Sequence, residues 1–150
     1  AYQLFRQTKD VNNKYYYPSN YYFGYIAYTK QKFDDALATF EKLKESKVYE
    51  KVIPYYIAQI YFQRKQYNKV IEYLQPLIGE NSLKYFEELN LILGQAYYEN
   101  KNYEKAIKHI KIYIDKNKAR KEELYQLGYA YYQTKKYSDA ITHLQQLDNL

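Results

Sequence analysis

The sequence predicts an all-α array of paired helices, and three recurring features carry this prediction. A small residue returns at intervals of 34, 36 and 34 residues, at Gly24, Ala58, Gly94 and Gly128. A second small residue stands twelve positions after each of these, at Ala36, Val70, Ala106 and Ala140. An aromatic residue lies between the two, at Phe33, Tyr67, Tyr103 and Tyr137. A period near 34 residues is typical of a helix–turn–helix unit that buries its apolar face by stacking on further copies.

Four copies of this unit follow one another along the chain. We place the first repeat at residues 17–50, the second at 51–86 with a two-residue insertion, the third at 87–120 and a shorter fourth at 121–150. Residues 1–16 are expected to form the second helix of a preceding repeat and a linker, because Ala1 and Phe5 have the spacing of that helix. This organisation predicts about nine helices.

The apolar residues of the fourth repeat have the spacing of single helical faces. They are Leu124, Leu127, Gly128 and Tyr131 in the first helix, and Ala140, Leu144 and Leu147 in the second. Such spacing places them on one side of each helix. Gly inside a helix costs roughly 1 kcal/mol relative to Ala, so its recurrence requires a packing reason. We expect the small residues to let two helix backbones approach closely.

The third copy contains Leu93, Gly94, Tyr97, Tyr103, Ala106 and Ile110, and the fourth contains Leu124, Leu127, Gly128, Tyr131, Tyr137, Ala140 and Leu144. This order of residues resembles the tetratricopeptide repeat (TPR), and the resemblance covers residues 17–150. It implies a right-handed α-α superhelix. The chain is similar to a segment of the long TPR proteins of bacteria, some of which are exported to the cell envelope, and this slightly favours an exported location over a cytoplasmic one.

The chain also departs from the TPR pattern. Where the family often has Gly in the turn between the two helices, this chain has Gln31, Lys65, Lys101 and Lys135. The Pro between repeats is replaced by Val48, Ser82 and Lys118. Pro54 is expected in the first turn of a helix. Pro76 should kink or end the second helix of the second repeat, with Gly79 available as a stop.

Polar residues that follow the central aromatic are expected to cap the second helices. They are Asp34, Asn68 and Ser138. Short polar side chains at a helix start accept hydrogen bonds from the first backbone N–H groups, which have no partner inside the helix.

In the TPR family the first helix of each repeat lines a concave groove, and this resemblance supplies the candidate binding residues. They are Tyr21, Tyr25, Tyr28, Tyr55, Gln59, Phe62, Gln95, Tyr98, Glu99, Tyr125, Tyr129, Tyr132 and Gln133. The sequence has 24 tyrosines, and many fall at these positions. One interpretation is that the rings pack on neighbouring helices. The other is that they bind a protein or peptide ligand, because tyrosine gives large contact area at low entropic cost.

One ligand of the family is not expected. TPR modules that hold the acidic C-terminal tails of heat-shock chaperones use a clamp of Lys, Asn and Arg. The matching positions hold Tyr21, Tyr25, Tyr56, Glu88 and Ile92. None of these side chains can form the clamp, and Glu88 has the wrong charge.

The sequence also contains no signature of an enzyme. There is no Cys, no Gly-rich phosphate loop and no nucleophile motif, so neither a cofactor nor a metal is expected. His109 and His143 stand at equivalent places in adjacent repeats. Without Cys or carboxylate ligands at matching spacing, we interpret them as repeated surface residues.

Two alternative functions remain open, and the first is suggested by the net charge of +6. Aromatic rings with positive charge can hold single-stranded RNA. Against this, the predicted groove positions include no Lys or Arg, so nucleic acid is not the expected partner. The other alternative is a spacer segment of a longer TPR rod. Leu147 and Leu150 leave the last helix without a polar cap, which suggests further repeats or end-to-end self-association. No apolar run has the roughly 20 residues that a membrane span needs.

Overall fold

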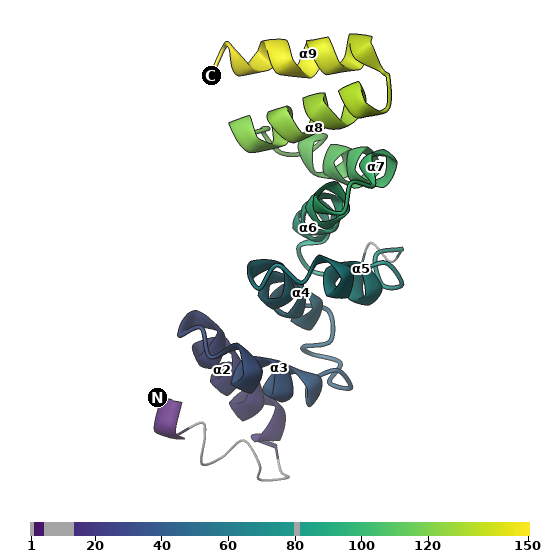
Figure 1. Ribbon diagram of the computed structural model, residues 1–150. Helices are drawn as coiled ribbons and strands as arrows, with labels where there is room; N and C mark the ends of the chain where they lie inside the picture. The colour runs from purple at the N-terminus through teal and green to yellow at the C-terminus, as the bar shows by residue number, and fades with distance from the viewer. Residues whose placement is uncertain (1, 5–13, 80–81) are drawn as a thin grey trace.

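The computed structural model describes residues 2–4, 14–79 and 82–150, which form a stack of paired helices with no strand among them (Figure 1). The pairs are α2 (Tyr16–Thr29) with α3 (Phe33–Glu41), α4 (Ile53–Gln63) with α5 (Tyr67–Leu74), α6 (Phe86–Glu99) with α7 (Tyr103–Ile114), and α8 (Lys121–Gln133) with α9 (Tyr137–Leu147). Residues 2–4 are also helical, where the second helix of a preceding repeat is expected. The rest of that expected helix and its linker, residues 5–13, lies outside the described residues. The all-α prediction is confirmed.

Each pair is closed by the same short turn. Its central residue is Gln31, Lys65, Lys101 or Lys135, and all four have a left-handed backbone with φ between 58° and 64°. In the first turn the N–H of Lys32 donates to the carbonyl of Ala27 at 2.8 Å, and the N–H of Gln31 donates to that of Tyr28 at 3.0 Å. This pair of bonds is the Schellman arrangement that ends many helices. The family's Gly at this position is therefore replaced by residues that adopt the glycine conformation.

The recurring small residues of the first helices face a large side chain sixteen positions later. A β-carbon at Gly24 would lie 2.6 Å from the ring of Phe40, and one at Gly128 would lie 2.5 Å from Leu144. At Gly94 it would lie 2.9 Å from the backbone nitrogen of Ile110, so α6 and α7 approach most closely. The second small residues, at Ala36, Val70, Ala106 and Ala140, are all buried.

The core runs along the stack and is densest at α6, where every residue from Leu89 to Tyr97 is buried. One cluster of buried apolar residues joins α4 to α9, and a second joins α2 to α4. Tyr55, Tyr61 and Tyr73 pack against both clusters. Each repeat therefore buries its apolar face against its neighbours, as a stacked array requires.

The expected caps are wrong. The residues at the starts of α3, α5 and α9 are Lys32, Gln66 and Lys136, and none makes a side-chain cap. Among the four second helices described, α7 alone has one, in which Asn102 accepts from the N–H of Lys105 at 3.4 Å. The predicted capping residues lie two positions later, inside the helices, and Asp34 and Asn68 bond across repeats instead. Asn68 accepts from the side-chain amide of Asn100 at 2.6 Å. Asp34 pairs with Arg64 at 3.0 Å.

The prolines behave as expected, and one glycine does not. Pro54 lies in the first turn of α4, and α5 ends at Leu74, just before Pro76. Gly79 does not take the left-handed conformation of a helix stop. Tyr85, immediately before α6, has a left-handed backbone with φ of 59°. No helix in the described part of the chain is long and apolar enough to span a membrane.

Candidate binding surface

Tyrosines from α2 and α4 gather around Tyr56, which is buried. The rings of Tyr21, Tyr25 and Tyr28 meet the Tyr56 ring edge to face, with centroids 6.3, 6.0 and 5.4 Å away. Tyr55 meets it in the same way at 5.6 Å. We call these five residues the N-terminal tyrosine cluster. Edge-to-face contacts of this kind add stability beyond the burial of area.

Polar atoms of this cluster are partly satisfied within it. The hydroxyls of Tyr21 and Tyr56 are hydrogen-bonded at 3.3 Å, and burial raises the pKa of Tyr56 well above its usual value. Gln63 donates to the hydroxyl of Tyr28 at 3.5 Å. Tyr85 lies against Tyr55 with centroids 4.5 Å apart. The sequence pattern placed Tyr56 only at a position of the chaperone clamp and did not single out Tyr85. The fold brings Tyr56 of α4 against α2, and Tyr85, which precedes α6, against Tyr55.

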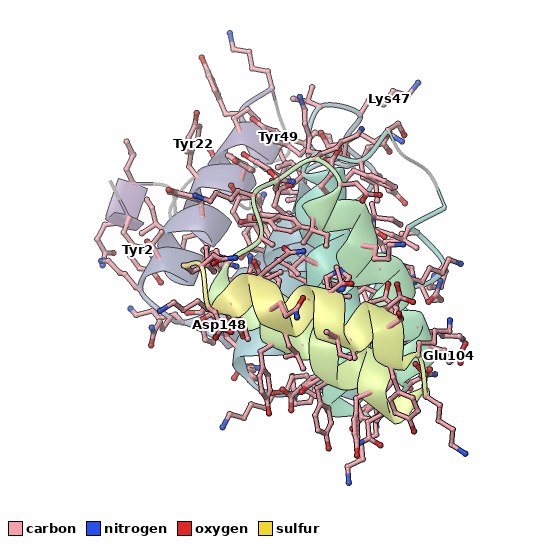
Figure 2. The ribbon with its side chains drawn as sticks, turned by 90° about the horizontal axis from the view of Figure 1, so that it is seen from above. Tyr2, Tyr22, Lys47, Tyr49, Glu104 and Asp148 are labelled. Atoms are coloured by element: carbon pink, nitrogen blue, oxygen red, sulfur yellow. The ribbon has the colours of Figure 1, made fainter. Side chains whose placement is uncertain are left out.

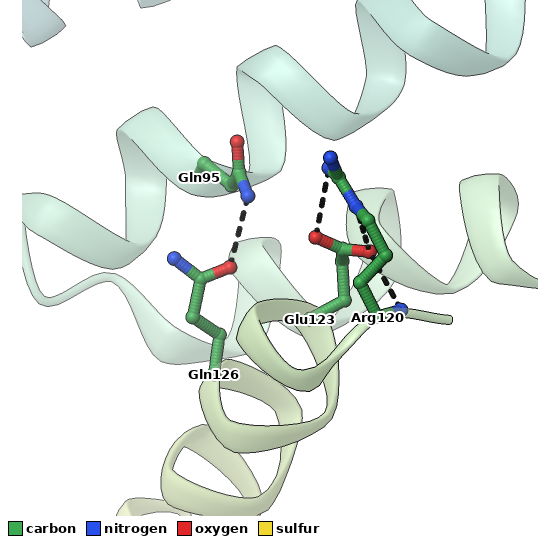
Figure 3. Close-up of polar contacts among 4 residues, drawn as sticks. All are labelled: Gln95, Arg120, Glu123 and Gln126. Carbon is green, nitrogen blue, oxygen red and sulfur yellow. Dashed lines mark hydrogen bonds and ion pairs between the residues drawn. The ribbon is translucent and has the colours of Figure 1, made fainter. Parts of the chain in front are cut away.

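Some of the predicted groove residues on α4 and α6 pack against other residues of the stack. The amide of Gln95 is buried and donates to the side-chain oxygen of Gln126 at 3.1 Å (Figure 3). Phe62 meets Tyr67 edge to face at 5.5 Å, and Gln59 is half-buried. Of the two predicted groove residues at the end of α6, Glu99 is exposed and Tyr98 is half-buried.

Four tyrosines of α6, α7 and α8 form a second group. The Tyr129 ring lies 6.2 Å from that of Tyr98, 5.8 Å from Tyr103 and 6.2 Å from Tyr125. Burial, followed by the neighbouring phenols, raises the pKa of Tyr98 to about 12. Tyr132 also lies on α8, and its ring centroid is 5.7 Å from that of Tyr137. We call Tyr98, Tyr103, Tyr125, Tyr129 and Tyr132 the C-terminal tyrosine cluster.

This second cluster presents rings to solvent. The exposed fractions of Tyr125, Tyr129 and Tyr132 are 53%, 37% and 52%. Together with Gln133 and Leu144 they line a hollow of about 400 Å³ on α8 and α9. All three tyrosines and Gln133 are predicted groove residues, so the structure brings four of the thirteen together in one concavity.

An ion pair between residues three positions apart lies at the start of α8. The carboxylate of Glu123 is fully buried and accepts from the backbone N–H of Arg120 and from its guanidinium, at 3.0 and 3.0–3.1 Å (Figure 3). The bonds to Glu123 raise the pKa of Arg120. The carboxylate therefore also satisfies a backbone N–H group at the start of the helix.

The net positive charge comes from one stretch of the sequence. Residues 101–121 contain eight basic and two acidic residues, which accounts for the whole net charge of +6. On α7 the side chains of Lys105, Lys108 and Lys111 are exposed. The predicted groove residues, which lie on α2, α4, α6 and α8, carry no cation.

The two histidines lie in different surroundings, and the expectation that both are surface residues is wrong for His109. Only 3% of His109 is exposed, and its ring stacks on Tyr97 at 5.8 Å. Its Nδ1 lies 2.8 Å from the side-chain oxygen of Asn90, which can only accept, so Nδ1 carries the proton. Burial lowers the pKa of His109 to about 4. Within the described ranges no three His, Cys, Asp or Glu side chains could hold a metal ion.

Comparison with known proteins agrees with the repeat pattern. The sequence signature of the family "Anaphase-promoting complex, cyclosome, subunit 3", a TPR-type family, matches residues 80–147. The chain has a tetratricopeptide-repeat-like fold. No curated protein sequence matches it significantly.

Solved structures share the TPR fold along almost the whole chain. MamA, residue 41 to the end, from Desulfovibrio magneticus RS-1 is 16% identical, with a TM-score of 0.78. The match covers 99% of this chain and 82% of MamA. A MamA RS-1 double mutant designated ArsTM is likewise 16% identical, with the same coverage of both chains and a TM-score of 0.79. TPR-like folds are in general protein-interaction scaffolds and are typically non-catalytic.

Proposed function

We propose that this TPR protein is a non-catalytic scaffold that binds a protein or peptide through the tyrosines of its first helices. One observation carries the proposal. Tyr125, Tyr129 and Tyr132 remain between about one-third and one-half exposed although they line one hollow. Rings that served only to pack the stack would be buried in the way Tyr56 is.

The chemistry of the surface favours a polypeptide ligand. Tyrosine combines a rigid apolar ring with one hydroxyl, and it is enriched where partners dock. Gln133 adds an amide at the rim of the hollow, and Glu99 adds a carboxylate on α6. A single-stranded nucleic acid would need cations beside the rings, and the predicted groove positions include no Lys or Arg.

The proposal is tested by a double variant that removes one exposed ring from each tyrosine cluster. Tyr25→Ala with Tyr129→Ala is compared with wild type in affinity capture from lysate of the source organism, read by mass spectrometry. Val48→Ser is the matched control, because Val48 is exposed on the segment between α3 and α4. Circular dichroism verifies that all three proteins keep their helical content.

We expect a protein that is captured by wild type and by the Val48 variant and is lost with the double variant. Partners that stay bound to the double variant would place the binding site elsewhere. Capture that disappears after nuclease treatment would support RNA as the ligand. If wild type captures nothing specific, the segment acts as a spacer in a longer rod.

A further inference from the structure

A cavity of about 300 Å³ lies where α3, α4 and α5 meet, on the side of the stack that α3 and α5 share in Figure 1. Its floor is apolar and includes the buried side chains of Ile53, Ile57 and Leu83. Its other walls include Tyr73, Glu41, Lys44, Glu50 and Lys51. None of the predicted groove residues, all of which the structure describes, lines it. Helix pairs on both sides of the cavity are described, so it belongs to the junction between two repeats.

The next junction along the stack is closed by a hydrogen bond that this junction lacks. The hydroxyl of Tyr97 on α6 donates to the side-chain oxygen of Gln75, which follows α5. The equivalent residues one repeat earlier are Tyr61 on α4 and Glu41 on α3. Within the described ranges no hydrogen bond joins these two, and Glu41 accepts from Lys44 instead, at 3.4 Å. The α3 helix is therefore not tied to the following pair in the way that α5 is.

A second polar contact of the later repeat is also missing here, and this leaves the hydroxyl of Tyr73 without a partner. Tyr73 holds the position of His109 one repeat earlier, and Pro54 holds that of Asn90. His109 and Asn90 are hydrogen-bonded at 2.8 Å, whereas Pro54 has no side-chain acceptor. Among the described residues the Tyr73 hydroxyl makes no hydrogen bond, and burial, followed by the charge of Glu41, raises the pKa of Tyr73 above its usual value. The phenol is therefore neutral, and its O–H is a donor that the fold does not use.

The charged residues at the cavity carry both signs. Glu41 and Lys44 form an ion pair at 3.4 Å with side chains 61% and 67% exposed, and exposed pairs of this kind contribute little to stability. Both groups can therefore exchange their partner for a ligand at little cost. In the described part of the chain Glu50 has no ion pair, and Lys51, the next residue, brings a second ammonium group to the wall. Figure 2 shows Lys47, from the same segment, projecting outward from the stack.

We infer that this cavity binds a free apolar α-amino acid. The side chain of the ligand lies on the floor formed by Ile53 and Ile57. Its ammonium group pairs with the carboxylate of Glu50, and its carboxylate accepts from the hydroxyl of Tyr73 and from the ammonium group of Lys51. A volume near 300 Å³ is at the lower end of the range for small-molecule pockets, which suits a ligand of this size.

Charge complementarity selects this class of ligand. A hydrocarbon would leave the Tyr73 hydroxyl and the Glu50 carboxylate without partners, which is unfavourable for polar groups removed from water. A ligand with only a carboxylate would meet Glu41 and Glu50 without a compensating cation, and an amine would meet Lys44 and Lys51 in the same way. An α-amino acid carries one charge of each sign beside its side chain, and the cavity offers two carboxylates and two ammonium groups beside an apolar floor.

The probes are L-phenylalanine and L-leucine, titrated into the 150-residue chain and followed by methyl NMR. We expect the methyl resonances of Ile53, Ile57 and Leu83 to shift, and those of Ile110, which is buried elsewhere in the stack, to stay in place. The control ligands are glycine, L-phenylalaninamide and N-acetyl-L-phenylalanine, which lack the apolar side chain, the carboxylate and the ammonium group. Each should bind about tenfold more weakly than L-phenylalanine, or not at all.

Two conservative variants remove the polar partners of the ligand. Glu50→Gln and Tyr73→Phe should each weaken the binding of L-phenylalanine about tenfold, since each removes one hydrogen bond to a charged group. The matched controls are Glu45→Gln, exposed between α3 and α4, and Tyr61→Phe, whose ring meets that of Tyr73 without lining the cavity. Both controls should bind like wild type. Circular dichroism verifies that all four variants keep their helical content.

Three results would overturn the inference. The first is that neither amino acid shifts the resonances of the cavity. The second is that Glu50→Gln and Tyr73→Phe bind L-phenylalanine as tightly as wild type. The third is that L-phenylalaninamide or N-acetyl-L-phenylalanine binds as tightly as the free amino acid, which would assign the cavity to the terminal residue of a peptide.

This site is independent of the proposed function, and the two are tested separately. Tyr25→Ala with Tyr129→Ala should bind L-phenylalanine like wild type, because neither residue lines the cavity. Tyr73→Phe should still capture the protein partner. Partner capture without amino-acid binding would keep the proposed function and refute the cavity ligand, and the reverse result would keep the ligand and refute the proposed function.

Discussion

Gly94 and Ile110 hold α6 and α7 at the closest backbone approach among the helical glycines. A β-carbon at residue 94 would lie 2.8 Å from Cγ1 of Ile110 and 2.9 Å from its backbone nitrogen. At Gly128 the nearest atoms belong to the Leu144 side chain, which is one-third exposed. A side chain can turn away from an added methyl group, whereas a helix backbone cannot.

This difference predicts that a change of Gly to Ala destabilises the protein more at residue 94 than at residue 128. Gly94→Ala should lower the free energy of unfolding by about 1–3 kcal/mol, because the added carbon forces α6 and α7 apart. Gly128→Ala should be nearly neutral, since Ala is favoured over Gly in a helix by roughly 1 kcal/mol and Leu144 can move. Urea denaturation measures both. Equal destabilisation by the two changes would show that the backbone contact at Gly94 has no special weight.

The left-handed turn residues predict a stabilising change. Lys101 has φ of 63°, a conformation that costs a non-glycine residue roughly 1 kcal/mol. Lys101→Gly should therefore raise the free energy of unfolding by about 0.5–1 kcal/mol. The matched control is Lys105→Gly, inside α7, which should lower it by roughly 1 kcal/mol. A melting temperature that falls with Lys101→Gly would contradict the argument from backbone strain.

The buried imidazole of His109 predicts a loss of stability in mild acid. Burial lowers the pKa of His109 to about 4, from the usual histidine value of about 6.5. The unfolded chain therefore takes up a proton at higher pH than the folded chain, and stability falls as the pH drops below about 6.5. Between pH 7 and pH 5 this effect lowers the free energy of unfolding by up to about 2 kcal/mol.

The measurement is the free energy of unfolding against pH for two variants. His109→Gln should flatten the decrease between pH 7 and pH 5, whatever its effect on stability at pH 7. His143→Gln, at the equivalent position one repeat later, should retain the decrease. If the His109 variant follows the same pH profile as wild type, another group is responsible.

The carboxylate of Glu123 predicts a sharp contrast with its neighbour. Glu123 is fully buried and bonded to the Arg120 guanidinium and backbone N–H, whereas Glu122 is exposed. Glu123→Ala should lower the free energy of unfolding by about 1.5–3 kcal/mol, the usual contribution of hydrogen bonds to a charged group. Glu122→Ala should remain within about 0.5 kcal/mol of wild type. Thermal unfolding of the two variants measures the contrast, and similar melting temperatures would refute a structural role for the pair.

Much of the fold could be predicted because its signals are local. The spacing of Leu124, Leu127, Gly128 and Tyr131 describes a helical face in any surroundings, and the recurrence of Gly and Ala near every 34 residues indicates stacked pairs. The caps could not be predicted in the same way. Asp34 has the residue type of a cap, but the Schellman turn places it inside α3, where it pairs with Arg64.

The candidate surface was predictable as a set of positions, and its division into buried and open parts was not. Tyr28 and Tyr132 are equivalent in sequence, yet Tyr28 is half-buried against Tyr56 and Tyr132 lines an open hollow. Gln95 lies in the same predicted groove and is used to bind Gln126. These outcomes depend on which residue the adjoining repeat presents, and the repeats differ at that position.

The sequence by itself determined the helices, their pairing and the tyrosine-rich first faces, because each follows from periodicity within one repeat. The tertiary structure alone decided that His109 is buried, that Lys101 adopts the glycine conformation and that Tyr125, Tyr129 and Tyr132 surround a hollow. The physical reason is that burial in a stacked array is a property of two neighbouring repeats, whereas a sequence pattern describes one repeat at a time.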